Sequence, residues 1–407
     1  MKGRYKMLEF RPPRKNPKFR LKTKSKENMI CICHKEKTER ELLIYYALAY
    51  KKSARIIVDS IYEKKQPNIS ELDFYFFPIA YLYRHSLELM LKAIGFKFFL
   101  NEDKKREILS ISHNLVEILE KVEVFIKGIN SEDRIWLKAF LSSINEIDQA
   151  SDAFRYPFKI NVVEDFTIKK VYSRKTVVET QTHVNLIAFV NKMEKAFAIL
   201  KDAFEKNNFE MYGYDYSAVF LEEGGTYYEQ SVIGYSYHKN RFYPYVAAYS
   251  ECAAILFSKY DEDKNLKSLI FFPMCYLFRN SLELLMKQLL FEECRLDFQK
   301  SAGIAMCCKH NLISLWEEIV PEVKMHTSDD HIKQIAEYIE QYSSFDNDGN
   351  KLRYPVQRNM KKYFKQKNKF DIKISYEFFI EIFTLLDGLN AIVSHNNEVE
   401  DDYRNQY

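Results

Sequence analysis

The sequence predicts an all-α protein made of two homologous helical bundles, with only minor β segments. Most segments place apolar residues at helical spacing. Gly and Pro number only 10 each, which is too few for a turn-rich β protein. One motif also occurs twice: residues 76–92 recur as residues 271–287, with 11 of 17 positions identical at an offset of 195. The apolar content of 47% excludes a disordered chain.

The duplication extends well beyond this motif. His113-Asn-Leu recurs as His310-Asn-Leu at an offset of 197, and Arg155-Tyr-Pro recurs as Arg353-Tyr-Pro at an offset of 198. We therefore expect two homologous domains, repeat 1 (38–205) and repeat 2 (236–395), each long enough to hold its own core. We expect them to pack as an internal pseudo-dimer, with the two motif helices near a pseudo-two-fold axis.

Three further segments complete the chain. Residues 1–37 form a basic arm, with 13 Lys and Arg against 3 Glu, and its prolines exclude a helix. The arm either binds nucleic-acid phosphates or is a solvated terminus. Residues 206–235 are a linker rich in Tyr and Gly that we expect to wrap onto a domain surface, and residues 396–407 are an acidic tail.

The periodicity predicts helices on both sides of the repeated motifs. Pro78 and Pro273 fit the first turn of the motif helix, and Gly95 fits its end in repeat 1. Two short β segments are expected after the Arg-Tyr-Pro elements, at 159–163 and 370–374. The other predicted helices are 39–62, 135–150 and 184–204 in repeat 1, and 245–260, 332–342 and 376–393 in repeat 2.

Each motif helix carries a polar stripe on an otherwise apolar surface. The spacings of three and four residues place its members on one helix face. Because an unpaired buried charge is very costly, these side chains must either pair with one another or line a cleft. Two interpretations remain open: a structural ion network, or an anion-binding cleft in which Arg and Lys are phosphate ligands. The stripe consists of Tyr81, Arg84, Glu88 and Lys92 in repeat 1, and of Tyr276, Arg279, Glu283 and Lys287 in repeat 2.

The other repeated polar residues have similar alternatives. His113 and His310 each open an amphipathic helix, either as packing or capping residues, with Ser112 as a candidate cap, or as functional groups. The Arg-Tyr-Pro elements add a second Arg and a phenol to each repeat, and the proline forces the preceding Tyr into an extended conformation. These residues are Arg155 and Tyr156, and Arg353 and Tyr354, and the alternative for the arginine is an ion pair with an acid such as Asp148.

Several kinds of chemistry have no motif in this sequence. There is no Gly-rich phosphate loop, nucleophile elbow or zinc-protease helix. Cys31-Ile-Cys33-His34 and Cys307-Cys308-Lys-His310 lack the usual Cys-x-x-Cys spacing of zinc sites, so we expect no metal and no cofactor. The longest apolar run is 269–278, too short for a bilayer, and the seven Cys are irregularly spaced. We therefore expect a cytoplasmic protein with no membrane contact.

At Arg84-His85-Ser-Leu-Glu-Leu and Arg279-Asn280-Ser-Leu-Glu-Leu the sequence resembles HEPN proteins, which are small helical bundles. Many members are metal-independent endoribonucleases of toxin–antitoxin, CRISPR and phage-defence systems. Their signature is an Arg, a polar residue and then a His on the same helix, and two such helices form one composite site across a dimer. Here Glu88 and its neighbours stand where that His would be, so His113 and His310 are the candidate replacements if folding brings them to the arginines.

The resemblance implies an RNA-directed effector, with endoribonuclease activity in phage defence or as a toxin. Arg84 and Arg279 would then stabilise the phosphorane, and His113 and His310 would transfer protons. The alternative is a non-catalytic module that binds a nucleotide, an RNA or a protein partner such as an antitoxin. A homo-oligomer is compatible with either function. The expected ligand-binding residues are His85, Glu88, Lys92, Arg155, Tyr156, Asn280, Glu283, Lys287, Arg353 and Tyr354.

Overall fold

The computed structural model describes residues 8–9, 11–15, 17–19, 25–126, 128–164, 170–176, 178, 180–205, 216–234 and 241–406. Within these residues the chain is mostly helical, as predicted, with a few short strands. The first half contains α1 (Glu39–Tyr62), α2 (Ile69–Phe98), α3 (Glu102–Ser110), α4 (Leu115–Val122), α5 (Ser131–Asp148) and α6 (Leu186–Glu205). The second half contains α7 (Tyr243–Glu262), α8 (Lys267–Gln288), α9 (Phe298–Cys308), α10 (Leu312–Val323), α11 (Asp329–Ser343), α12 (Asn350–Arg353) and α13 (Ile372–Gln406).

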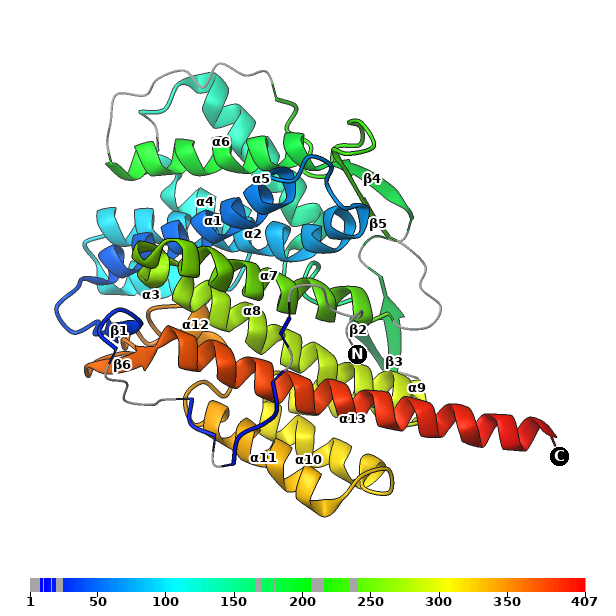
Figure 1. Ribbon diagram of the computed structural model, residues 1–407. Coiled ribbons are helices and arrows are strands. Elements are labelled where there is room, and N and C mark those ends of the chain that lie inside the picture. Colours follow the sequence, from blue (N-terminus) through cyan, green and yellow to red (C-terminus); the bar gives the residue numbers. More distant parts are fainter. Residues whose placement is uncertain are drawn as a thin grey trace.

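The two motif helices, α2 and α8, lie in the middle of the molecule (Figure 1). α2 packs against α1 and α8 packs against α7, and the two pairs meet because α1 contacts α8 and α2 contacts α7. On the outer sides, α6 covers α2 and α13 covers α8. Both motif helices are buried over nearly their whole length, as their apolar surfaces require.

The bounds of α1 agree with the prediction, because Thr38 and Glu41 form a capping box at its start. The bounds of the motif helices do not agree. α2 begins at Ile69 after the cap Asn68, so Pro78 lies inside the helix, and Pro273 likewise lies inside α8. Burial on all sides of these helices stabilises them enough to continue through a proline.

Gly95 also lies inside α2 and does not end it. A Cβ atom at this position would lie 2.3 Å from Cδ1 of Ile108, which belongs to α3. The glycine is therefore explained by the close approach of α3 to α2, and the helix continues to Phe98.

Two small sheets join the beginning of each half to the end of the other. β1 (Met29–Ile32), just before α1, pairs antiparallel with β6 (Asn368–Asp371), just before α13. β5 (Gln230–Ile233), before α7, pairs antiparallel with β4 (Thr182–Asn185), just before α6. In both sheets, a strand near the beginning of one half therefore pairs with a strand near the end of the other half. β5 belongs to the predicted linker, of which residues 206–215 and 235 lie outside the described residues.

The third sheet is the hairpin of β2 (Lys159–Glu164) and β3 (Lys170–Lys175). Its first strand confirms the β segment predicted at 159–163. The segment predicted at 370–374 is only partly a strand, because β6 ends at Asp371 and the next residues begin α13. The described residues also contain two 3₁₀ turns and one π-helical turn, at η1 (Glu123–Phe125), η2 (Lys264–Leu266) and η3 (Leu289–Glu293).

The described part of the basic arm contains no helix, as its prolines predict, and it packs onto the second half. Phe19 is buried and contacts aromatic rings that include Tyr342 of α11 and Phe379 of α13. Arg11 pairs with Glu377 at 2.7 Å, and Arg14 Nε pairs with Glu381 at 2.6 Å. At these two positions the arginines of the arm therefore pair with acidic residues of the same chain, while 39% of the Arg11 side chain and 40% of the Arg14 side chain stay exposed.

The acidic tail is helical to Gln406, as a continuation of α13 whose end extends beyond the rest of the molecule (Figure 1). In the described chain, two helical stretches are long and apolar enough to cross a membrane, Lys264–Glu293 and Ile372–Asn405. Their most apolar windows are 94% and 67% buried inside the protein. Buried core helices of globular proteins meet the same criteria of length and composition as membrane-spanning helices.

Candidate functional site

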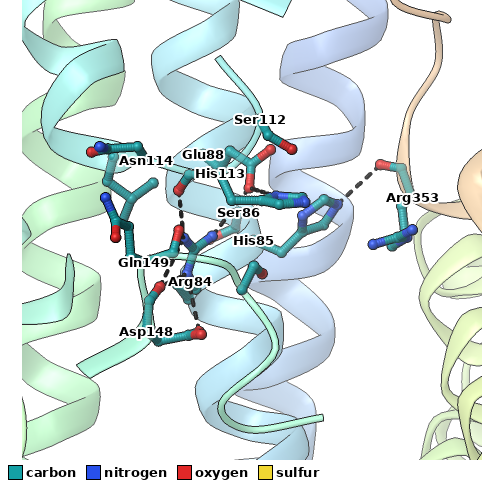
Figure 2. A network of polar contacts seen from close by, with 12 residues as sticks. Arg84, His85, Ser86, Glu88, Ser112, His113, Asn114, Asp148, Gln149 and Arg353 are labelled. Carbon is teal, nitrogen blue, oxygen red and sulfur yellow. Dashed lines mark hydrogen bonds and ion pairs between the residues drawn. The ribbon is translucent and has the colours of Figure 1, made fainter. Parts of the chain in front are cut away.

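A polar cluster around α2, which we call centre 1, consists of Arg84, Glu88, Lys92, His113 and Tyr354. The side chain of Arg84 lies between Asp148 on one side and Glu88 and His113 on the other (Figure 2). Its guanidinium pairs with Glu88 at 3.1 Å and with Asp148 at 3.2 Å, and it donates to the main-chain oxygen of His113 at 2.5 Å. The side chain is 0% exposed. Arg84 therefore cannot touch a ligand from solvent in this conformation, and its contacts hold the residues around it in place.

Glu88 is the hub of centre 1. Its carboxylate accepts hydrogen bonds from Lys92 Nζ at 2.7 Å and from the hydroxyl of Tyr354 at 2.9 Å, and it contacts Nδ1 of His113 at 3.0 Å. Burial alone would raise the pKa of Glu88, but Lys92 and His113 outweigh it and hold the pKa well below its ordinary value. Glu88 is therefore an ionised carboxylate, although it is fully buried.

The imidazole of His113 reaches the surface, because its side chain is 21% exposed. Burial lowers the pKa of His113 below its ordinary value, against the opposing effect of Glu88. The imidazole is then neutral near pH 7, and we assign the Nδ1 proton as the donor to Glu88. Nε2 keeps its lone pair and is the nitrogen left for a ligand.

The sequence before α4 explains the position of His113. Asn114, rather than the expected Ser112, caps α4 by accepting from the main-chain nitrogen of Glu117. His113 therefore lies just outside the helix, with its carbonyl free to accept from Arg84. Ser112 has a different role, since its main-chain oxygen accepts from Lys92 at 2.9 Å.

The second half repeats this arrangement around α8, and we call the repetition centre 2. Arg279 is 2% exposed and donates to Glu283 and to the main-chain oxygen of His310. Glu283 accepts from Lys287 at 2.7 Å and contacts Nδ1 of His310 at 3.0 Å. Burial opposes ionisation of Glu283, but Lys287, His310 and Arg279 keep its pKa well below the ordinary value.

His310 is the exposed member of centre 2, with 37% of its side chain accessible. Glu283 favours the charged imidazole, but burial together with Arg155 and Lys287 outweighs this effect, and the pKa of His310 is lowered. Asn311 caps α10, as Asn114 caps α4. The two histidines thus share the same surroundings and the same direction of pKa shift.

Each centre receives its phenol from the other half of the chain. The hydroxyl of Tyr354, from repeat 2, donates to Glu88 in centre 1, and the hydroxyl of Tyr156, from repeat 1, donates to Glu283 in centre 2, each at 2.9 Å. Tyr81 and Tyr276, which are counterparts in the duplicated motif, stack on each other with centroids 5.0 Å apart. Each half therefore supplies one tyrosine to the centre in the other half.

The remaining predicted residues lie behind the two centres. His85 is buried, with Nε2 3.0 Å from the main-chain oxygen of Arg353, and burial lowers its pKa to about 3 (Figure 2). The guanidinium of Arg155 lies over the ring of Tyr81. Arg155 does not pair with Asp148, which pairs with Arg84 instead. His85, Arg155, Arg353 and Asn280 are each at most 6% exposed and support the centres from the interior.

One group of residues at centre 1 was missed by the sequence analysis. A cavity of about 210 Å³ opens beside Lys92, His113 and Tyr354. Its outer wall is the loop that follows the Arg-Tyr-Pro element of repeat 2, including Arg358 and Tyr363. No repeat or motif marks this loop in the sequence, so only its position after Tyr354 could have drawn attention to it.

In the part of the chain that the structure describes, no group of three or more His, Cys, Asp or Glu side chains is arranged to hold a metal ion. Cys31 and Cys33 lie on β1, whereas Cys307 and Cys308 end α9. The two thiol clusters considered in the sequence therefore do not meet in such a group.

Comparison of the chain with protein-family models, with curated proteins and with solved structures finds no match. The resemblance to HEPN proteins accordingly depends on the short motif around Arg84 and Arg279.

Proposed function

We propose that the chain is a tandem HEPN-like protein, an internal pseudo-dimer that cleaves RNA with one acid–base centre in each repeat. One observation carries the proposal. A partly exposed imidazole is held through Nδ1 by a fully buried carboxylate and approached by a tyrosine from the other repeat, and this constellation occurs twice. An orienting carboxylate behind a histidine is the usual support for a general base.

In the proposed reaction, Nε2 of His113 takes the proton from a ribose 2′-hydroxyl. The 2′-oxygen attacks the adjacent phosphorus, the bond to the 5′-oxygen breaks, and that oxygen leaves with a proton returned by an imidazolium. The products are a 2′,3′-cyclic phosphate and a 5′-hydroxyl end. Lys92, which lines the same cavity as His113 and uses two of its three donors on Glu88 and Ser112, would stabilise negative charge on the phosphate. The hydroxyl of Tyr354 donates its one proton to Glu88 and so supports the carboxylate behind the base. His310, Lys287 and Tyr156 take the same roles in centre 2.

The burial of the arginines changes their expected part in this reaction. Arg84 and Arg279 become positioning residues, because each holds the glutamate and the backbone of the histidine instead of the phosphorane. The unpaired state of all seven cysteines, which lie within the described residues, supports the proposed cytoplasmic location.

End-group analysis of RNA incubated with the protein tests the proposal, in buffer with and without chelator. We expect 2′,3′-cyclic phosphate ends in both buffers, and loss of cleavage when His113→Gln and His310→Gln are combined. Cleavage should decrease as the pH falls through the pKa values of His113 and His310, both of which burial lowers below the ordinary value of about 6.5. His395→Gln is the matched control, because His395 is exposed on α13, outside both centres. Cleavage by a correctly folded double variant at the wild-type rate would refute the assignment.

A second function is favoured by one observation, the complete burial of Arg84 inside an ion network. In this alternative the chain is a non-catalytic module that binds a nucleotide, an RNA or a protein partner such as an antitoxin. RNA binding without any new ends would favour it over the nuclease.

A further inference from the structure

Two cavities meet at the loop outside centre 1. The first, of about 210 Å³, contains His113 and Tyr354 in its wall. The second, of about 540 Å³, is lined by residues that include Asn347 and Asn359. Gln357, Arg358 and Tyr363 line both cavities. The two cavities therefore adjoin at these three side chains, and we call the pair of cavities the groove.

The loop that forms the groove is a built structure. Val356 bridges Lys362, the main-chain nitrogen of Gln357 donates to Lys361, and Met360 adopts the left-handed conformation with φ 65°. Backbone groups of the loop are thus bonded to one another, so the loop has a defined conformation. Arg358 is exposed and forms no ion pair with any residue in the described chain.

The groove has the chemistry of a nucleotide site. The guanidinium of Arg358, which has no ion-pair partner among the described residues and lines the same cavity as Lys92, suits a phosphate, because an arginine can hold a phosphate with two parallel hydrogen bonds. The amides of Asn347, Gln357 and Asn359 offer donors and acceptors that match base edges. The carboxylate in the wall, Asp348, already accepts from the main chain and side chain of Asn350, which reduces its repulsion of an anion.

We propose that this groove binds one nucleotide of single-stranded RNA, with its phosphate on Arg358 and its base among the amides. This inference rests on the proposed function, and it adds that centre 1 is the substrate-engaging centre. Repeat 1 has no equivalent groove residue, because the counterpart of Arg358 at the offset of 198 is Ile160 of β2. At this position of repeat 1 the chain continues into the hairpin of β2 and β3. The side chain of Gln299 on α9 accepts from the main-chain nitrogen of Tyr172 on β3 and donates to its main-chain oxygen.

The test compares Arg358→Ala with Lys361→Ala. Both substitutions remove one positive charge from the same loop, but Lys361 does not line either cavity. Binding of a fluorescein-labelled single-stranded RNA of about 12 nucleotides is measured by anisotropy at physiological salt. We expect Arg358→Ala to weaken binding roughly tenfold, the ratio that corresponds to one lost charge-assisted hydrogen bond. We expect Lys361→Ala to weaken it by no more than about twofold.

Equal losses in the two variants would overturn the subsite, since they would show attraction by charge alone. Equal competition by double-stranded RNA of the same length would also overturn it. The measurement is repeated in the His113→Gln and His310→Gln double variant, so that binding is read without cleavage. Arg358-dependent binding without cleavage by the wild type would support the subsite and refute the nuclease. Cleavage with the same KM in Arg358→Ala and Lys361→Ala would support the nuclease and refute the subsite.

Discussion

Replacing Arg84 by Met should destabilise the protein far more than replacing an arginine with the same local geometry on the surface. Arg84 pairs with Glu88 four residues later on α2, and Arg55 pairs with Asp59 four residues later on α1. The partners differ in burial, because Arg84 and Glu88 are each 0% exposed whereas Arg55 and Asp59 are 44% and 41% exposed. The comparison therefore measures what the buried network, with its additional partners Asp148 and His113, adds to an ion pair of the same spacing.

The expected magnitude follows from the contacts that disappear. Removing Arg84 leaves the carboxylate of Asp148 and the main-chain oxygen of His113 without the positive guanidinium that now pairs with them. Breaking a buried ion pair from one side costs about 3–5 kcal/mol. An exposed pair at the same spacing contributes only about 0.3–0.5 kcal/mol. The methionine fills much of the space of the arginine stem, so the cavity left behind is small.

Equilibrium unfolding in urea, followed by circular dichroism and tyrosine fluorescence, measures both variants at pH 7.5. Arg84→Met should lose about 4 kcal/mol, and Arg55→Met should lose less than about 1 kcal/mol. Free energies of unfolding that differ by less than about 1 kcal/mol between the two variants would refute the reasoning, because the buried network would then contribute nothing beyond an ordinary helix pair.

Two further predictions concern the support of the centres. Tyr354→Phe and Tyr156→Phe should each destabilise the protein by about 1–2 kcal/mol, because each leaves a buried glutamate without one donor, and unequal losses in urea unfolding would argue against equivalent centres. Stability should also fall as the pH decreases from about 6.5 toward 3, because the unfolded chain protonates His85 at its ordinary pKa whereas burial lowers its folded pKa to about 3. The loss from this residue approaches about 1.4 kcal/mol per pH unit. His85→Asn, which copies Asn280 of repeat 2, should remove it, and parallel pH curves for wild type and variant would contradict this account.

The helices were predictable where periodicity and a local cap coincide, as at α1 with Thr38 and Glu41. They were misjudged where tertiary burial overrides a local signal. Pro78 has the character of a helix start, but the apolar residues before it are buried against neighbouring helices and extend α2 back to Ile69. The basic arm is a similar case, because the position of Phe19 depends on a pocket built by α11 and α13.

The candidate centres were predictable only where helix spacing alone brings the residues together. The spacing of Arg84, Glu88 and Lys92 already places the pairing groups on one helix face, and these pairs are present. The approach of His113 depends on the turn before α4, and the arrival of Tyr354 depends on how the two halves pack. Neither can be read from local sequence, because both are contacts between distant parts of the chain.

The two tyrosines make each half depend on the other. Tyr354 contacts His113, which lies 241 positions earlier in the chain, and Tyr156 contacts His310 of the second half. A gene cut between the repeats would encode fragments that each lack the hydroxyl bonded to their own buried glutamate. Loss of the Tyr-Pro element from either half therefore removes a hydrogen-bond donor from the interior of the other half.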